Sequence, residues 1–337
     1  MSASLLRRLS LAACAVLVGL AVPARAEPAE AVTMAVPAVS LSFTLGYLAE
    51  DLGFFAAQGL AVKQIEIQGL GAINSVISGS SDFAEPSAAS VTRAAARGQR
   101  LLAIVELTER PFAQLVARKD VAAAAGFDPA APLAQRGLFL KGRTIGVDSI
   151  NSVNHAYLRL IAIGSGLDPE DVRIAVLAPA NMLAAFETKQ IDGFVMTPPW
   201  PLKPVLDGTG TMIASGPDGD PGNLLPFAQT VLATRPELCE KRPATCAKMG
   251  HAFAGAAAAV RDHPDEALAA LDKRFATLDP KLMAVAFAVL RKITPSPPAV
   301  SAIALEHAEA YNIQAGLMKP EEKLKSYDDL FTDKYVR

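Results

Sequence analysis

Residues 32–67 show four successive patterns of hydrophobic and polar positions. Val32–Val36 is a short apolar run, followed by a polar loop at 37–44. Apolar residues then recur every three or four positions over 45–52, which predicts a helix. Residues 62–67 alternate apolar and polar as a strand does. The stretch therefore predicts a strand, a polar loop, a helix and a second strand. In open α/β sheets, ligands bind at such a loop, between a strand's carboxyl end and a helix N-terminus.

The same order of patterns returns about 110 residues further on. Residues 143–147 are the strand, 148–154 the polar loop, 155–163 the helix and 172–177 the next strand. Each half then continues with a short predicted helix, a strand and a polar Pro-containing loop, namely Glu85-Pro86-Ser87 and Thr197-Pro198-Pro199-Trp200. Two α/β lobes with a cleft between them are predicted. The alternative is a chance similarity of two generic βαβ units.

Two further segments resemble each other and predict strands that connect the lobes. They are 112–119 and 227–234, which both begin Phe-Ala-Gln. We interpret them as paired hinge strands, although a short shared tripeptide can also be coincidence. The predicted division is residues 31–112 for lobe one, 113–222 for lobe two, and 223–337 for the return strand and a helical tail. The tail should pack on lobe one, with helices predicted over 236–241, 243–261, 264–275, 280–293, 298–315 and 323–330.

The pattern of the N-terminal residues predicts an export signal that is removed. Arg7-Arg8 precedes an apolar run at 9–22, and Ala24-Arg25-Ala26 fits the small-x-small cleavage rule. The predicted signal peptide is 1–26, because the apolar run is shorter than the roughly 20 residues needed to span a bilayer. Two alternatives are a lipoprotein signal ending at Cys14 and a twin-arginine signal. The protein is therefore expected in the periplasm.

Charge argues against a nucleic-acid partner. The whole chain has a formal net charge of −2, and removal of residues 1–26 with their three arginines gives about −5. Because no basic patch is interleaved with aromatic residues, nucleic-acid binding is not expected.

The mature chain has two cysteines, Cys239 and Cys246. Pro243 lies between them and predicts the start of a new helix. Cysteines that flank a helix–helix turn can come close enough to bridge, and an exported protein meets an oxidising compartment. We favour a disulfide over two buried free thiols. No matching His or second Cys pair suggests a metal site.

Catalytic motifs are mostly absent. The chain has no G-x-S-x-G, P-loop, H-E-x-x-H or zinc-deaminase signature. Of its four histidines, only His155 follows a candidate ligand loop. We interpret Glu109-Arg110 as a salt bridge at the hinge, and the alternative is that the pair places a charge in the cleft. An exported two-lobed chain without a catalytic set indicates binding.

The chain resembles the nitrate/sulfonate/taurine-type solute-binding proteins of ABC importers, the SsuA-like group. The resemblance rests on Gly46–Val62, Gly79–Phe83, Lys141–Val147 and Asp192–Trp200, and on Pro236-Glu-Leu and His263-Pro-Asp-Glu-Ala in the tail. It covers nearly all of the mature chain. It implies the type II periplasmic-binding-protein fold: two α/β lobes joined by two hinge strands, with a helical C-terminal tail.

The resemblance also implies which loops hold the solute, with no cofactor and no metal. By position these loops are 40–43, 69–72, 85–87, 151–154 and 197–200. The expected ligand-binding residues are Ser40, Ser42, Phe43, Gly71, Ala72, Glu85, Ser87, Asn151, Ser152, Asn154, Thr197 and Trp200. The expected partners are a small-molecule solute and an ABC permease at the inner membrane, and the protein is expected to be a monomer.

Glu85 and Trp200 depart from the pattern of simple anion binders. They leave room for an aromatic or cationic portion, so the expected solute is a sulfonate- or taurine-like anion or a pyrimidine-like compound. An alternative is an enzyme of the same fold that makes a thiamine pyrimidine with pyridoxal phosphate. That chemistry needs a cleft Lys and His and a cysteine-rich run, and the chain lacks such a run. A receptor's sensor module is a further alternative.

Overall fold

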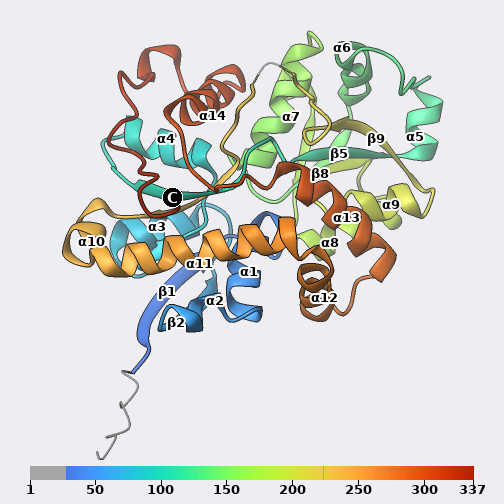
Figure 1. Cartoon of the computed structure of the whole chain (residues 1–337). Helices are drawn as coiled ribbons and strands as arrows, with labels where there is room; N and C mark the ends of the chain where they lie inside the picture. Colours follow the sequence, from blue (N-terminus) through green and yellow to red (C-terminus); the bar gives the residue numbers. More distant parts are fainter. Residues whose placement is uncertain (1–27, 223) are drawn as a thin grey trace, which may run out of the picture.

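Two five-stranded sheets flanked by helices form the two lobes of the computed structural model, which describes residues 28–222 and 224–337 (Figure 1). The strand order is β2-β1-β3-β10-β4 in lobe one and β7-β6-β8-β5-β9 in lobe two. The predicted signal peptide lies outside the described residues. The strands of lobe one are β1 (Glu30–Val36), β2 (Leu60–Glu66), β3 (Phe83–Ala84), β4 (Leu102–Thr108) and β10 (Thr230–Thr234). Those of lobe two are β5 (Gln114–Arg118), β6 (Thr144–Val147), β7 (Arg173–Val176), β8 (Gly193–Met196) and β9 (Gly210–Ser215).

The two strands expected to pair as a hinge lie in different sheets. β5 is antiparallel to β8 and β9, and β10 is antiparallel to β3 and β4. Both edges of each strand are occupied by its own sheet, so the predicted pairing between them is wrong. Their resemblance is nevertheless structural, because each is the fourth strand of its sheet. The chain crosses between lobes just before each strand, and the Phe227 N–H donates to the Glu109 carbonyl there (3.2 Å).

The helices of each lobe begin and end where local signals place them. Gly53 adopts φ 76°, which breaks the first helical pattern into α1 and α2. Ser152 caps α7, because its side chain accepts a hydrogen bond from the His155 N–H. Lobe one carries α1 (Thr44–Asp51), α2 (Phe54–Ala57), α3 (Gly71–Ser78) and α4 (Ala88–Ala96). Lobe two carries α5 (Lys119–Ala124), α6 (Leu133–Arg136), α7 (Val153–Gly164), α8 (Pro179–Glu187) and α9 (Leu202–Leu206).

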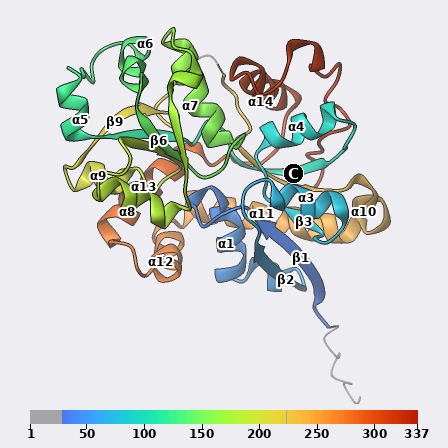
Figure 2. The same ribbon diagram turned by 180° about the vertical axis from the view of Figure 1, so that it is seen from behind.

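The helical tail packs on lobe one but also reaches lobe two (Figure 2). α11 contacts α1 and α2, and α14 contacts α4, as expected. In addition, α13 contacts α9, where Leu282 and Leu202 share one apolar cluster, and α14 contacts α7. The tail therefore braces both lobes. Its helices are α10 (Pro236–Lys241), α11 (Pro243–Asp262), α12 (Pro264–Arg274), α13 (Pro280–Ile293) and α14 (Ala302–Gln314).

The helix predicted over 323–330 is absent, apart from a short 3-10 turn at Pro320–Glu322 just before it. Tertiary contacts replace the helical bonds there. Glu309 of α14, fully buried, accepts hydrogen bonds from the Leu324 N–H (2.9 Å) and the Tyr327 hydroxyl (2.5 Å). These two hydrogen bonds hold the segment against α14.

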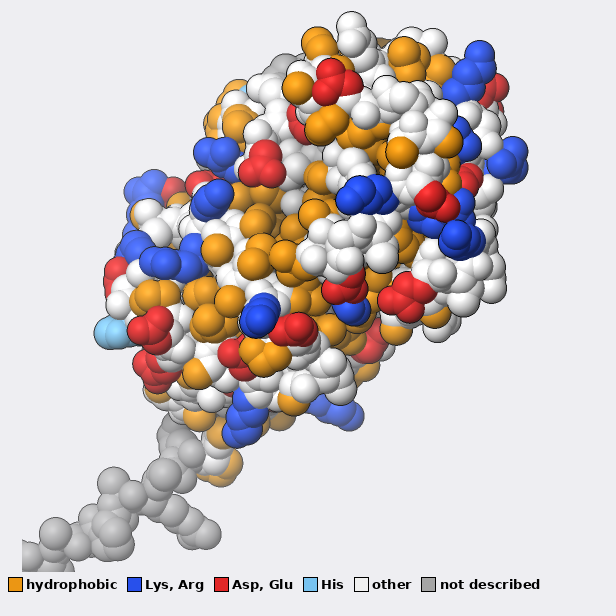
Figure 3. Space-filling model, turned by 90° about the vertical axis from the view of Figure 1, so that its right-hand side faces the viewer, with side chains coloured by type: hydrophobic (Ala, Val, Ile, Leu, Met, Phe, Trp, Pro, Cys, Tyr) orange, Lys and Arg blue, Asp and Glu red, His pale blue; other side chains and the backbone are white. Residues whose placement is uncertain are grey.

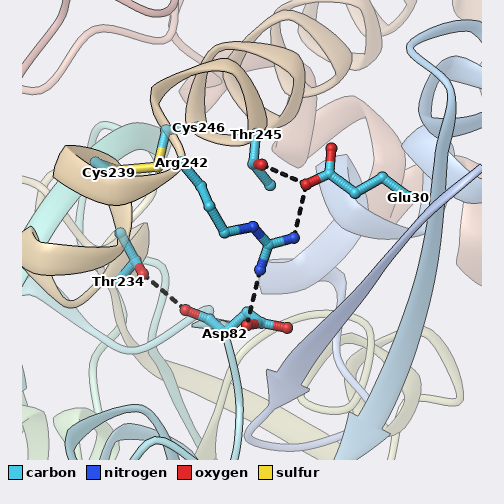
Figure 4. The surroundings of a disulfide bond; sticks show 7 residues. All are labelled: Glu30, Asp82, Thr234, Cys239, Arg242, Thr245 and Cys246. Carbon is cyan, nitrogen blue, oxygen red and sulfur yellow. Dashed lines mark hydrogen bonds and ion pairs between the residues drawn. A yellow bond between two sulfur atoms is a disulfide. The ribbon is translucent and has the colours of Figure 1, made fainter.

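Cys239 and Cys246 form a disulfide that joins α10 to α11 (Figure 4), which confirms the favoured pairing. Between them, Arg242 reaches the Glu30 carboxylate of β1 (2.6 Å) and Asp82 (3.5 Å). Hydrogen bonds from Thr245 and Arg242 lower the pKa of Glu30 to about 2. The disulfide turn is thereby tied to the first strand of the sheet.

The surface of the molecule at the end formed by lobe two has no large area of a single charge sign. Figure 3 displays this face, where Lys and Arg side chains are interspersed with Asp and Glu among apolar ones. A nucleic-acid interface requires a basic stripe, and this face does not present one.

Candidate functional site

A cavity of about 80 Å³ lies between the lobes. Its walls come from the loops after β1, β2 and β3 in lobe one, and from those after β6 and β8 in lobe two. Gln229 and Thr230, at the return crossover, complete it. The carboxyl ends of parallel strands from both sheets thus face one space, as open α/β sheets place their ligand sites.

Most of the expected ligand-binding residues line this cavity. They come from four of the five predicted loops, and the fifth, 69–72, lines the wall through Gly69 and Leu70 rather than through the expected Gly71 and Ala72. The expected residues in the wall are Ser40, Ser42, Phe43, Glu85, Ser87, Ser152, Asn154 and Thr197. Their contact with a solute stays a prediction.

Four expected residues lie outside the wall. Gly71 and Ala72 form the first turn of α3, and Ala72 is fully buried, so Gly69, Leu70 and Ile73 face the cavity instead. Asn151 adopts φ 60°, and its peptide N–H donates to His155 Nδ1 (3.0 Å). Trp200 donates its indole N–H to the Val39 carbonyl (3.2 Å) across the two lobes. Helix phase and loop turns, which sequence spacing did not resolve, decided these positions.

Sequence reasoning missed several residues of the wall. Asp148 is the first residue after β6 and was included only as part of a loop. Gln229 belongs to the segment interpreted as a hinge, and its side-chain oxygen accepts from the Phe112 N–H (3.4 Å). The remaining missed polar residues are Ser90 and Thr230, whose hydroxyls no loop motif announced.

Two carboxyl groups give the cavity its electrostatic character. Glu85 is fully buried, and neither of its oxygens has a hydrogen-bond donor among the described residues. Burial raises the pKa of Glu85 well above its ordinary value. Asp148 accepts from Ser152 Oγ (2.8 Å) and Asn154 Nδ2 (3.1 Å). Burial also raises the pKa of Asp148, and those two hydrogen bonds act against the rise.

His155 does not face the cavity. Its Nδ1 accepts the Asn151 N–H, and burial, followed by the charge of Arg159, lowers the pKa of its ring. The described wall contains no Lys, Arg or His at all. No group of three or more His, Cys, Asp and Glu side chains in the described ranges is arranged to hold a metal ion.

Direct contacts hold the lobes together over the cavity. The Ser40 and Thr197 hydroxyls lie 2.5 Å apart, one from each lobe. Arg93 of α4 donates to the Asn151 carbonyl (2.8 Å) on the other side. The two lobes are therefore in direct contact beside the cavity.

Comparison with known proteins identifies the family of this chain and structures that share its fold. The profile of the family described as NMT1/THI5 like matches residues 40–267. The chain belongs to the NMT1/THI5 like family. The SsuA-like resemblance is confirmed, because the alkanesulfonate-binding protein SsuA of Xanthomonas axonopodis, solved with MOPS, has this fold. It superposes with a TM-score of 0.70 at 18% identity, covering 91% of this chain and 99% of that one.

Two further solved structures have the same fold. A protein of Bordetella bronchiseptica gives a TM-score of 0.76 at 21% identity, over 91% of this chain and 96% of the other. The periplasmic nitrate-binding protein NrtA of Synechocystis gives 0.68 at 14%, over 90% and 86%. A curated relative, the bicarbonate transport ATP-binding protein CmpC of Synechocystis, is 26% identical over 178 residues, or 50% of this chain. That match spans about a quarter (26%) of the relative's length. The two-lobe periplasmic-binding fold is thus established.

Proposed function

We propose that this protein is the solute-binding component of an ABC importer and captures a small organic solute between its lobes. The observation that carries the proposal is the cavity built from strand-end loops of both sheets, with hydrogen bonds joining the lobes beside it. Relatives with the same fold are named as sulfonate- and nitrate-binding proteins. One water needs roughly 10–15 Å³, so the cavity of about 80 Å³ has room for several waters and hence for a solute of one small ring.

The cellular setting follows from the same proposal. The protein is exported by the segment 1–26, acts as a monomer in the periplasm, and hands its solute to a permease at the inner membrane. The related binding proteins SsuA and NrtA, one of Escherichia coli and one of Synechocystis, are described as periplasmic. In the described part of the chain, no helix is both long and apolar enough to cross a membrane.

Binding is favoured over the pyrimidine-synthesising enzyme. Pyridoxal phosphate chemistry uses a Lys that forms a Schiff base with the cofactor. The described wall has hydroxyls, amides and two carboxyls, and contains neither Lys nor His. These groups can hydrogen-bond a solute and orient it, which is the task of a binding protein.

The hinge is proposed to open and close on the solute. Two crossovers join the lobes, and such connections permit domain closure around a ligand. X-ray scattering with and without a saturating solute should show a smaller radius of gyration in the complex. An unchanged radius despite proven binding would contradict closure.

A thermal-shift screen over sulfonates, taurine, nitrate, pyrimidines, carboxylates and small amines tests the function. A solute at about 100 times its dissociation constant should add about 2.7 kcal/mol of stability. Ser42→Ala in the wall should weaken the hit, whereas Ser80→Ala, an exposed serine outside the cavity, should not. No hit from any class would count against a solute-binding role.

A further inference from the structure

The wall of the cavity contains buried hydrogen-bond acceptors that have no partner among the described residues. Three buried side-chain atoms that face it lack a partner among the described residues: both Glu85 oxygens and Asn154 Oδ1. Buried polar groups are normally paired, and an unpaired one costs about 1–3 kcal/mol. A bound partner that supplies several N–H groups would satisfy these acceptors.

The position of Glu85 is built for a carboxyl group rather than merely tolerant of one. Its Oε1 lies against Gly46 of α1, where an added Cβ would come within 2.4 Å. Glycine at position 46 gives this oxygen room, and a larger residue there would displace it. Met34 of β1 lies against the same position, and no side chain of the described residues pairs with the carboxyl.

Charge in the wall is of one sign. The wall contains Asp148 from lobe two and Glu85 from lobe one. Tyr47 of α1 is a further titratable group near enough to interact electrostatically with Glu85. No Lys, Arg or His of the described wall offsets them. An anionic solute would find no Lys, Arg or His in the described wall, and Glu85 and Asp148 would repel it wherever they are ionised, which disfavours it in a desolvated site.

We infer that the solute carries a cationic nitrogen head group, of the amidinium or protonated-amine class, which donates to Glu85 and Asn154. The inference rests on the proposed solute-binding function and decides between its solute classes. The head group supplies the missing N–H donors and a counter-charge for Glu85. Phe43 and Ile73 in the same wall accommodate the solute's apolar part.

Binding of such a cation should release a proton. Burial raises the pKa of Glu85, which favours the protonated carboxyl in the empty site. A bound cation stabilises the carboxylate and expels that proton to solvent. Affinity for the cation should accordingly rise as pH rises through the neutral range.

Isosteric probes of different charge test the inference. Calorimetry with the full mature chain would use acetamidine, acetamide and acetate, and the larger set benzamidine, benzamide and benzoate. The amidines should bind at least tenfold more tightly than the amides, and the carboxylates should not bind. Titration in two buffers of different ionisation enthalpy should show about one proton released per amidine bound by the wild type.

Matched variants locate the effect. Glu85→Gln should weaken amidine binding at least tenfold and abolish proton release, while amide binding changes little. Glu66→Gln, an exposed carboxyl of the same lobe, should change neither. Gly46→Ala should weaken amidine binding because the added methyl group crowds the Glu85 carboxyl, and circular dichroism would verify that each variant is folded.

Several results would overturn the inference. They are equal binding of amidine and amide, preference for a carboxylate or sulfonate, no amidine binding at millimolar concentration, or unaltered amidine binding by folded Glu85→Gln. An anion that binds while amidines do not would overturn the cation class and leave the solute-binding function standing. Failure of every class in the thermal-shift screen would remove both.

Discussion

Glu106 should make the stability of this protein fall as pH rises. It lies on β4, is 4% exposed, and its Oε1 has no partner among the described residues. Burial, together with the nearby charge of Glu109, raises its pKa from 4.5 to about 8. A carboxyl whose pKa is raised on folding contributes stability below pH 4.5 and loses it as pH rises through 8.

The size of the effect follows from that rise. Each tenfold change in proton affinity is worth about 1.4 kcal/mol, so ionisation of Glu106 costs on the order of 5 kcal/mol between pH 4.5 and pH 9. Glu106→Gln removes the titration and keeps the shape of the side chain. Relative to wild type, the variant should therefore gain about 4 kcal/mol between pH 4.5 and pH 8.

Urea unfolding followed by circular dichroism measures this gain at a series of pH values. The comparison between the two proteins cancels the titration of distant groups. Glu321→Gln, at an exposed position, controls for the loss of one charge. If the difference between wild type and Glu106→Gln is the same at pH 4.5 and pH 8, the carboxyl ionises in the folded state without penalty and the reasoning is refuted.

Three further variants test the frame around the site. Ser152→Ala removes the cap of α7 and should cost about 1 kcal/mol in urea unfolding; no loss would show that the cap is replaceable. Replacing Cys239 and Cys246 by Ser opens a short loop, which should cost roughly 2–3 kcal/mol; two free thiols in the unreduced denatured wild type would contradict the bridge. Glu30→Gln should lower stability at pH 7 by about 1–2 kcal/mol, after discounting for its partial exposure. Because the pKa of Glu30 is lowered to about 2, this deficit should vanish in acid unfolding as pH falls from 4.5 to 2, and a pH-independent deficit would contradict the assignment.

The sequence by itself determined the elements and much of the site. Hydrophobic periodicity and glycine punctuation identified the repeated strand–loop–helix units, because these signals depend on local geometry alone. Prolines at the first helical turn marked α10 to α13 for the same reason. The order of the motifs sufficed to identify the family. Strand-end loops then placed residues such as Ser40, Glu85 and Asn154 near the cavity, since parallel strands end at one edge of a sheet.

Only the tertiary structure decided which groups meet. That β5 and β10 enter different sheets depends on long-range pairing, which a shared Phe-Ala-Gln tripeptide does not encode. The exclusion of Ala72 and Asn151 from the wall depends on helix phase and on one residue with positive φ. The space for the buried Glu85 carboxyl depends on Gly46, a residue of another element that leaves room for its oxygen. Burial and the supply of partners are properties of the packed chain, and they give this cavity its unmatched acceptors.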